Sequence, residues 1–254
     1  IKLSEGMTND MLLKPPAIMR AVKALLEFKN IITKNEVPKT VAVATAAVRK
    51  AKNSAEFLAD IKNAVGIVIE VINGEREAMY DYLAVKYTLG CSKCVICDIG
   101  GGSTELIGVN GEMTNAISIP HGSRGITETF FENGETAEAI GSAENFINSL
   151  LSKESWLSRY EGAPIVGIGG CLRSIAKYDI SDFSAQKINK HTINSSRLNE
   201  IYKTLKNIPL PLRQTMAGIG KERADIIMGG YIPLMCLKNK ILAPQLVVSD
   251  VGVK

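Results

Sequence analysis

The amino-acid sequence predicts an α/β fold that contains antiparallel hairpins. Two observations lead to this prediction. Segments in which apolar residues recur at helical spacing alternate with short apolar runs that have the length of strands. Several of these runs end in turn residues, and the Asn110-Gly111 pair between two of them is typical of a tight hairpin. No repeat of solenoid length interrupts this order.

The first part of the chain alternates helices and strands. Pro15 and Pro16 mark the start of an amphipathic helix over residues 16–34, and Ser54 is predicted to cap a helix over residues 56–64. Apolar runs predict strands at residues 40–45 and 67–72. Asn73-Gly74 ends the second strand, and we expect a helix over residues 75–89 to follow.

The second part begins with three apolar runs that predict a meander, at residues 94–99, 105–109 and 113–119. Further strands are expected at residues 164–168 and 245–249. Helical spacing predicts the remaining helices over residues 136–152, 172–177, 196–207 and 222–237.

Composition limits the class of protein. The chain has 254 residues, 46% of them hydrophobic, which excludes a disordered or collagen-like protein. Its net charge of +4 is too small to indicate nucleic-acid binding. No apolar run is long enough for a membrane helix, and five cysteines, three of them crowded together, fit a reducing cytoplasm. A composition shift near Gly90 predicts two domains, residues 1–90 and 91–254.

The most informative stretch runs from a buried strand through Asp98 and three consecutive glycines to a second strand. Glycines let the backbone approach a ligand closely, and successive N–H groups in such a loop can hold phosphate oxygens. Ser103 and Thr104 add hydroxyl groups. Asp98 and Glu105 would repel phosphate by themselves, so the pattern indicates a divalent cation such as Mg²⁺. No Lys-Ser/Thr pair follows the glycines, so this is not a Walker loop.

This stretch, Asp98-Ile99-Gly100-Gly101-Gly102-Ser103-Thr104-Glu105, resembles the second phosphate loop of the exopolyphosphatase and guanosine pentaphosphate phosphatase family. Three other stretches resemble segments of the same family in the same order along the chain. They are residues 44–53 (ATAAVRKAKN), residues 72–78 (INGEREA), and a C-terminal pair at residues 223–227 (RADII) and 248–252 (VSDVG).

The resemblance implies two ribonuclease-H-like lobes of the actin-like ATPase superfamily, each with a mixed sheet flanked by helices, around an active-site cleft. It implies hydrolysis of terminal phosphate from polyphosphate with Mg²⁺. Glu77 takes the position of the family's general base and Arg49 that of its cleft arginine, while Asp98 matches its metal-associated aspartate. The residues matched to phosphate binding are Gly100, Gly101, Gly102, Ser103, Thr104 and Glu105.

The chain departs from the family pattern at three places. Arg76 stands where the family commonly has the first glutamate of a pair. Arg124 falls one position before the family's arginine, which aligns with Gly125. The family's first phosphate loop, of Asp-x-Gly-Ser-Asn-Ser type, does not occur in this sequence, so we expect the first lobe to lack its opening hairpin. The Gly167-Ile168-Gly169-Gly170 turn resembles the family's third glycine motif.

Several alternatives remain open from the sequence. The substrate can be polyphosphate or guanosine pentaphosphate, and a phosphate- or nucleotide-binding module without turnover is a third hypothesis. An actin-like ATPase or a sugar kinase is a more distant one. A homodimer is compatible with the sequence, and no membrane or nucleic-acid partner is expected. An iron–sulfur cluster on Cys91, Cys94 and Cys97 is disfavoured, because residues three apart in a strand point to opposite faces.

Overall fold

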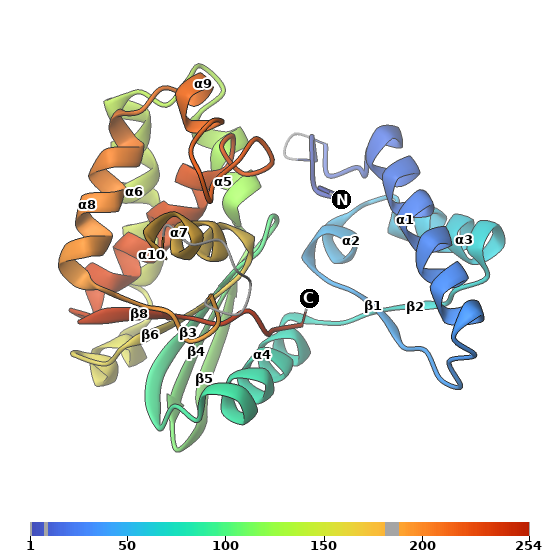
Figure 1. The fold of residues 1–254 in the computed structure, drawn as a ribbon, viewed down its shortest axis with the longest axis horizontal. Coiled ribbons are helices and arrows are strands. Elements are labelled where there is room, and N and C mark those ends of the chain that lie inside the picture. Colours follow the sequence, from blue (N-terminus) through green and yellow to red (C-terminus); the bar gives the residue numbers. More distant parts are fainter. Residues whose placement is uncertain (1, 8–9, 181–187, 254) are drawn as a thin grey trace. The chain divides into compact units, whose positions relative to one another are not determined.

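The computed structural model describes residues 2–7, 10–180 and 188–253 and is drawn in Figure 1. Its contacts divide the chain into two units, Ile1–Gly74 and Glu75–Lys254. Helices and strands alternate in both units, which confirms the predicted α/β class. In the described part of the chain, no helix combines the length and the apolar character needed to cross a bilayer.

The first unit contains a two-stranded parallel sheet and three helices. Its elements are α1 (Pro15–Lys34), β1 (Ala42–Ala44), α2 (Ala46–Lys50), α3 (Ser54–Val65) and β2 (Ile69–Val71). Apolar side chains of the helices pack into one core that includes Phe57, Ile61 and Val65 of α3. Asn53, not the predicted Ser54, is the N-cap residue of α3. The Asn53 side chain makes no capping hydrogen bond to the helix. Its Oδ1 accepts a hydrogen bond from the N–H of Leu13 at 2.9 Å, and its Nδ2 donates to the carbonyl of Leu13 at 3.1 Å.

The second unit is built on a mixed six-stranded sheet in the order β5-β4-β3-β6-β8-β7. The strands are β3 (Lys93–Ile99), β4 (Thr104–Asn110), β5 (Glu112–Ile119), β6 (Ile165–Ile168), β7 (Thr192–Asn194) and β8 (Gln245–Val248). The strands β3, β4 and β5 form the predicted antiparallel meander, while β6 pairs in parallel with both β3 and β8. This order is the ribonuclease-H-like arrangement.

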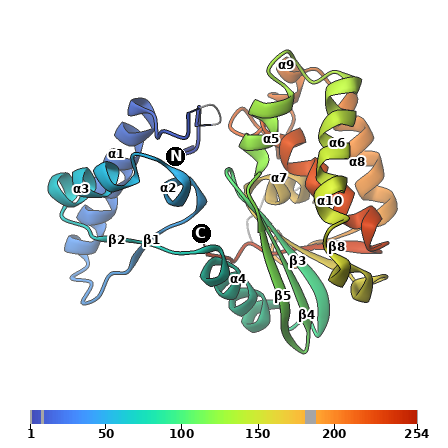
Figure 2. The same cartoon turned by 180° about the vertical axis from the view of Figure 1, so that it is seen from behind.

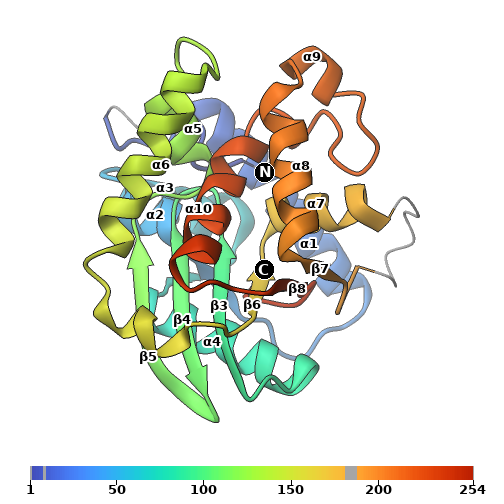
Figure 3. The ribbon, with the colours of Figure 1, turned by 90° about the vertical axis from the view of Figure 1, so that its left-hand side faces the viewer.

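Helices cover both faces of this sheet. They are α4 (Gly74–Leu89), α5 (Ser123–Phe130), α6 (Ala137–Leu151), α7 (Gly170–Ile180), α8 (Ser195–Asn207), α9 (Leu210–Arg213) and α10 (Ile227–Lys240), with a 3₁₀ turn, η1 (Ser155–Tyr160). Figure 3 shows α6, α8 and α10 in front of the strands. Figure 2 shows α4 beside the meander.

Alternation along β3 produces two separate cores. Val95, Cys97 and Ile99 point into the large core under the helical layer, whereas Cys94 and Ile96 point into a smaller core on the opposite face. Three residues of α4 complete that smaller core, namely Ala78, Tyr82 and Val85. Because α4 packs on the sheet of the second unit, the structure divides the chain after Gly74 and not at Gly90, where the composition shift lies.

Several further elements differ from the expectation, among them the short elements β7, α9 and η1, which the sequence did not predict. Helix α5 is not predicted; it is short, and two of its three buried residues, Ser123 and Arg124, are polar. The predicted helix over residues 222–237 begins only at Ile227, since residues 221–226 form consecutive turns.

Candidate active site

Three carboxylates meet on the face of the sheet that α4 covers. Asp98 lies one residue before the end of β3, opposite Glu105 of β4 in the antiparallel register. Both side chains therefore point to the same side as Cys94 and Ile96. Glu77 lies in the first turn of α4. One oxygen of each of the three lies within 4.8 Å of the others. The fold therefore brings together three of the residues that the sequence matched to the family's site.

This acidic cluster (Glu77, Asp98 and Glu105) is almost completely buried, with exposed fractions of 0%, 3% and 0%. The Ser118 hydroxyl, which stands beside Glu105 in the ladder, donates to Glu105 Oε1 at 2.8 Å. Glu105 Oε2 is buried and accepts no hydrogen bond from the described residues. Burial, with the charges of Glu77 and Asp98, raises the pKa of Glu105 to about 7.

Asp81 is a fourth buried acid, one helical turn beyond Glu77 on α4, with an exposed fraction of 0%. The N–H of Val253 donates to its Oδ1 at 3.0 Å, while Oδ2 is buried without a partner among the described residues. Burial raises the pKa of Asp81 to about 8, and the charges of Asp98, Glu105 and Glu77 add to this effect. The sequence analysis missed Asp81, although its spacing of four from Glu77 on a helix could have indicated it.

Four carboxyl groups this close cannot all be ionised in a dry site without a compensating positive charge. Either protons or a cation must supply that charge. Carboxylate oxygens are the ligands that Mg²⁺ prefers, and the unpartnered Glu105 Oε2 offers one directly. The acidic cluster therefore fits a divalent cation. Within the described residues it is the one group of acid, histidine or cysteine ligands with suitable spacing.

The glycine loop (residues 100–103) joins β3 to β4 and is held by the start of α5. The N–H groups of Ser123 and Arg124 donate to the carbonyls of Gly100 and Gly101, at 2.9 and 3.1 Å. A Cβ atom on Gly122 would lie only 2.5 Å from the carbonyl oxygen of Gly100, so only glycine permits this contact. The loop is thus a fixed structure next to the acidic cluster.

The two loop hydroxyls bond within the protein. Thr104 is 1% exposed, and its hydroxyl donates to the carbonyl of His121 at 2.9 Å. Ser103 is also 1% exposed, and its hydroxyl counteracts the rise in the Glu105 pKa. The half-buried glycines of the loop are more accessible than these hydroxyls.

The three arginines that the sequence analysis compared with the family lie in different surroundings. Arg49 lies on α2 in the first unit, and its guanidinium donates to the carbonyl of Ile72 at 2.8 Å. Arg76 is exposed and contacts Tyr80 through a hydrogen bond of 2.8 Å. Arg124 pairs with Asp225 at 3.0 Å.

The turn at residues 167–170, which resembles the family's third glycine motif, lies against Asp98 of the acidic cluster. Gly169 has a φ of +109°, and a Cβ there would approach Ile99 O to 2.5 Å and Asp98 Oδ1 to 3.1 Å. The neighbouring Gly170 borders a hollow of about 280 Å³ whose basic lining residues are Arg173, Lys177, Lys221 and Arg223. The turn therefore connects the carboxylates to a basic surface within the second unit.

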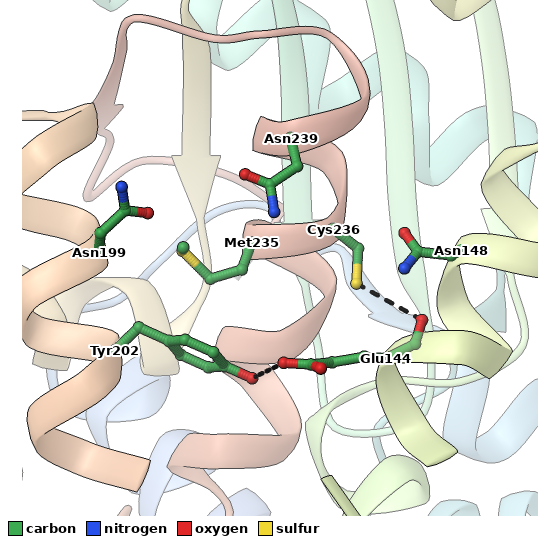
Figure 4. A pocket seen from close by; sticks show the side chains of 7 residues that line it. All are labelled: Glu144, Asn148, Asn199, Tyr202, Met235, Cys236 and Asn239. Carbon is green, nitrogen blue, oxygen red and sulfur yellow. Dashed lines mark hydrogen bonds between the residues drawn. The ribbon is translucent and has the colours of Figure 1, made fainter. Parts of the chain in front are cut away.

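Another hollow, of about 300 Å³, lies between α6, α8 and α10 (Figure 4). Its side chains include Glu144, which accepts a hydrogen bond from the Tyr202 hydroxyl at 2.7 Å. None of the residues predicted for the site lines it.

Cys94 and Cys97 point into different cores on opposite faces of the sheet, as the alternation along a strand predicts. Both are fully buried.

Buried carboxylates beside a glycine loop on a ribonuclease-H-like sheet are an arrangement suited to an enzyme that acts on phosphate groups. The chain belongs to the Ppx/GppA phosphatase family, whose sequence profile matches residues 1–254. It is accordingly a phosphatase, a hydrolase of phosphate-containing substrates.

Solved structures agree with this assignment. The chain is similar to the Ppx/GppA family member of Aquifex aeolicus, with 32% identity over 98% of this chain and 82% of that chain, at a TM-score of 0.78. A type II variant of the Aquifex aeolicus phosphatase is 31% identical over 98% and 84% of the two chains, at a TM-score of 0.75. An exopolyphosphatase from Cytophaga hutchinsonii, 23% identical over 99% and 84%, shares the fold at a TM-score of 0.92.

Proposed function

We propose that the protein is an exopolyphosphatase that removes terminal phosphate from inorganic polyphosphate by attack of an activated water. The observation that carries this proposal is the acidic cluster, three buried carboxylates within 4.8 Å of one another, beside the glycine loop.

Glu77 is the proposed general base. Its place in the first turn of α4 directs a buried carboxylate into the acidic cluster, and a carboxylate there can remove a proton from water. Gly100, Gly101 and Gly102 let the phosphate that is attacked approach the backbone closely, although the N–H of Gly100 itself donates to the carbonyl of Ser103 at 3.0 Å. Arg49 supplies a guanidinium that can grip phosphate oxygens. Ser103 and Thr104 support the loop from within.

Asp98 and Glu105 are the proposed ligands of Mg²⁺. When bound, the ion neutralises phosphate charge and polarises the bond that breaks. The two carboxylates face each other across the ladder, so β3 and β4 hold them at a fixed separation before any substrate arrives.

The basic hollow favours a substrate with several phosphates. Gly169 touches Asp98 on one side, and Gly170 borders the lysines and arginines of the hollow on the other. A chain of phosphates leaving the acidic cluster along this turn would meet Lys177 and Arg223, which can neutralise it. Guanosine pentaphosphate presents the same terminal phosphates, so direct comparison of the two substrates decides between them.

Phosphate release by the Glu77→Gln variant tests the proposal. We expect kcat to fall by at least about a hundredfold with polyphosphate, because the variant keeps the shape of the side chain and removes its basicity. Glu75→Gln is the matched control, since Glu75 lies in the same turn of α4 but is exposed, and it should retain activity.

Both substrates are assayed with Mg²⁺ and with EDTA. A wild-type chain that releases phosphate only from guanosine pentaphosphate would reassign the substrate and leave the site intact. Full activity of Glu77→Gln would remove Glu77 from the mechanism.

A further inference from the structure

Cys91 and Cys94 form a pair of thiols at the junction of α4 and β3. Gly90 ends α4 in the left-handed conformation, with a φ of +67°, and a bend at Ser92 precedes the strand. Cys94 lies in the small core on the α4 side of the sheet, and Cys91 packs against the same core. The two side chains therefore lie on one face, in contrast to Cys94 and Cys97.

The two thiols differ in their access to solvent. Cys91 is half-buried, and its thiol donates to the carbonyl of Lys93 at 3.5 Å, whereas Cys94 is 0% exposed in the core that Cys91 packs against. The neighbouring Cys94 thiol lowers the pKa of Cys91 to about 7, while the same interaction, together with burial, raises the pKa of Cys94. An accessible thiol with thiolate character beside a buried partner is the arrangement of a reactive and a resolving cysteine.

The other cysteines lack this arrangement. Cys97, Cys171 and Cys236 are buried, with exposed fractions of 0%, 1% and 4%. Burial raises the pKa of all three thiols. They serve as internal controls within the same chain.

We propose that Cys91 and Cys94 are a site of reversible oxidation, with hydrogen peroxide as the oxidant. The Cys91 thiolate attacks one peroxide oxygen, the O–O bond breaks, and hydroxide leaves, which yields a sulfenic acid on Cys91. The Cys94 sulfur then attacks the Cys91 sulfur, and its proton leaves with the displaced hydroxide as water. The two thiols lose two electrons to the peroxide, and a disulfide between Cys91 and Cys94 results.

Peptide mapping tests this proposal without any assay of phosphatase activity. Lys93 stands between the two cysteines, so trypsin separates residues 87–93 from residues 94–124. After mild peroxide treatment and alkylation, we expect these two peptides to remain joined, with two fewer hydrogen atoms than their sum. Dithiothreitol should separate them.

Two variants complete the test. Cys97→Ala removes the other cysteine of the second peptide and should still give the joined peptides. Cys94→Ala should instead leave a sulfenic acid on Cys91, which a dimedone reagent labels. In the native protein, iodoacetamide should modify Cys91 on the order of tenfold faster than Cys97, Cys171 or Cys236. Unjoined peptides after oxidation of the folded wild type, or joining that persists in Cys94→Ala, would overturn the proposal.

Discussion

Asp81 illustrates at the scale of single residues how burial changes a carboxyl group. It is as buried as Glu77 and Glu105, and one of its oxygens has no partner among the described residues. A carboxyl group in such surroundings keeps its proton to a higher pH than it does in the unfolded chain. The stability of the protein without a divalent cation must therefore depend on pH.

The sign of this dependence follows from the raised pKa values. In the unfolded chain these carboxyls ionise near pH 4, whereas Glu105 and Asp81 keep their protons in the folded protein to about pH 7 and 8. Their contribution to stability is fully present below pH 4 and is lost as the pH rises to 8. In EDTA, we expect the protein to unfold at a lower temperature at pH 8 than at pH 5.5. The free energy of unfolding should be smaller at pH 8 by an amount on the order of a few kcal/mol.

Asp81→Asn should flatten this profile. The amide cannot ionise, and its oxygen can still accept the hydrogen bond from Val253. The exposed Asp60→Asn variant is the control and should follow the wild type. Calorimetric scans at several pH values measure the effect, and an unchanged slope in Asp81→Asn would contradict the assignment.

At the scale of elements, the contact between the glycine loop and α5 decides how firmly the loop is held. Gly122→Ala places a methyl group 2.5 Å from one backbone carbonyl and 2.7 Å from the backbone N of Ser103. Backbone atoms cannot move aside cheaply, so we expect a loss of about 1–3 kcal/mol in stability. The displaced loop should also raise the KM for polyphosphate.

Gly125→Ala is the matched control in the same helix, because a Cβ at Gly125 meets no atom within 4 Å. Alanine there should be neutral or stabilising by about 0.5–1 kcal/mol, since it favours the helix. Urea unfolding and phosphate-release kinetics measure both variants. Equal stability of the two variants would show that the glycine loop accommodates a methyl group at position 122.

Helices and strands could be predicted from the sequence where their pattern involves only neighbouring residues. The meander was predicted closely, because its strands are continuous apolar runs separated by turn residues. Helix α5 was missed, since its buried Ser123 and Arg124 are determined by contacts with the glycine loop and Asp225. Its helical state depends on residues that are distant in sequence.

At the scale of the whole molecule, the two units have separate cores. The cores on the two faces of the second unit's sheet consist of residues beyond Gly74, and the core of the first unit consists of residues before it. Each unit therefore has its own apolar interior.

We expect a fragment of residues 73–254 to unfold in a single cooperative transition. It contains the complete six-stranded sheet with both helical layers, and also the acidic cluster. Differential scanning calorimetry checks the transition, and added Mn²⁺ should raise its midpoint by a few degrees at pH 8. The Glu105→Gln fragment is the control and should respond less. A broad transition without cooperativity would show that the second unit needs the first.

The sequence by itself determined the α/β class, the meander with its glycine loop, and the likeness of Glu77, Asp98 and Glu105 to a phosphatase site. These features are carried by local periodicity and by motifs of a few neighbouring residues. Tertiary structure alone decided that α4 belongs with the second unit, that Asp81 joins the buried acids, and that the loop hydroxyls face inward. The physical reason is that burial and cross-strand register depend on residues far apart in the chain, which no local pattern records.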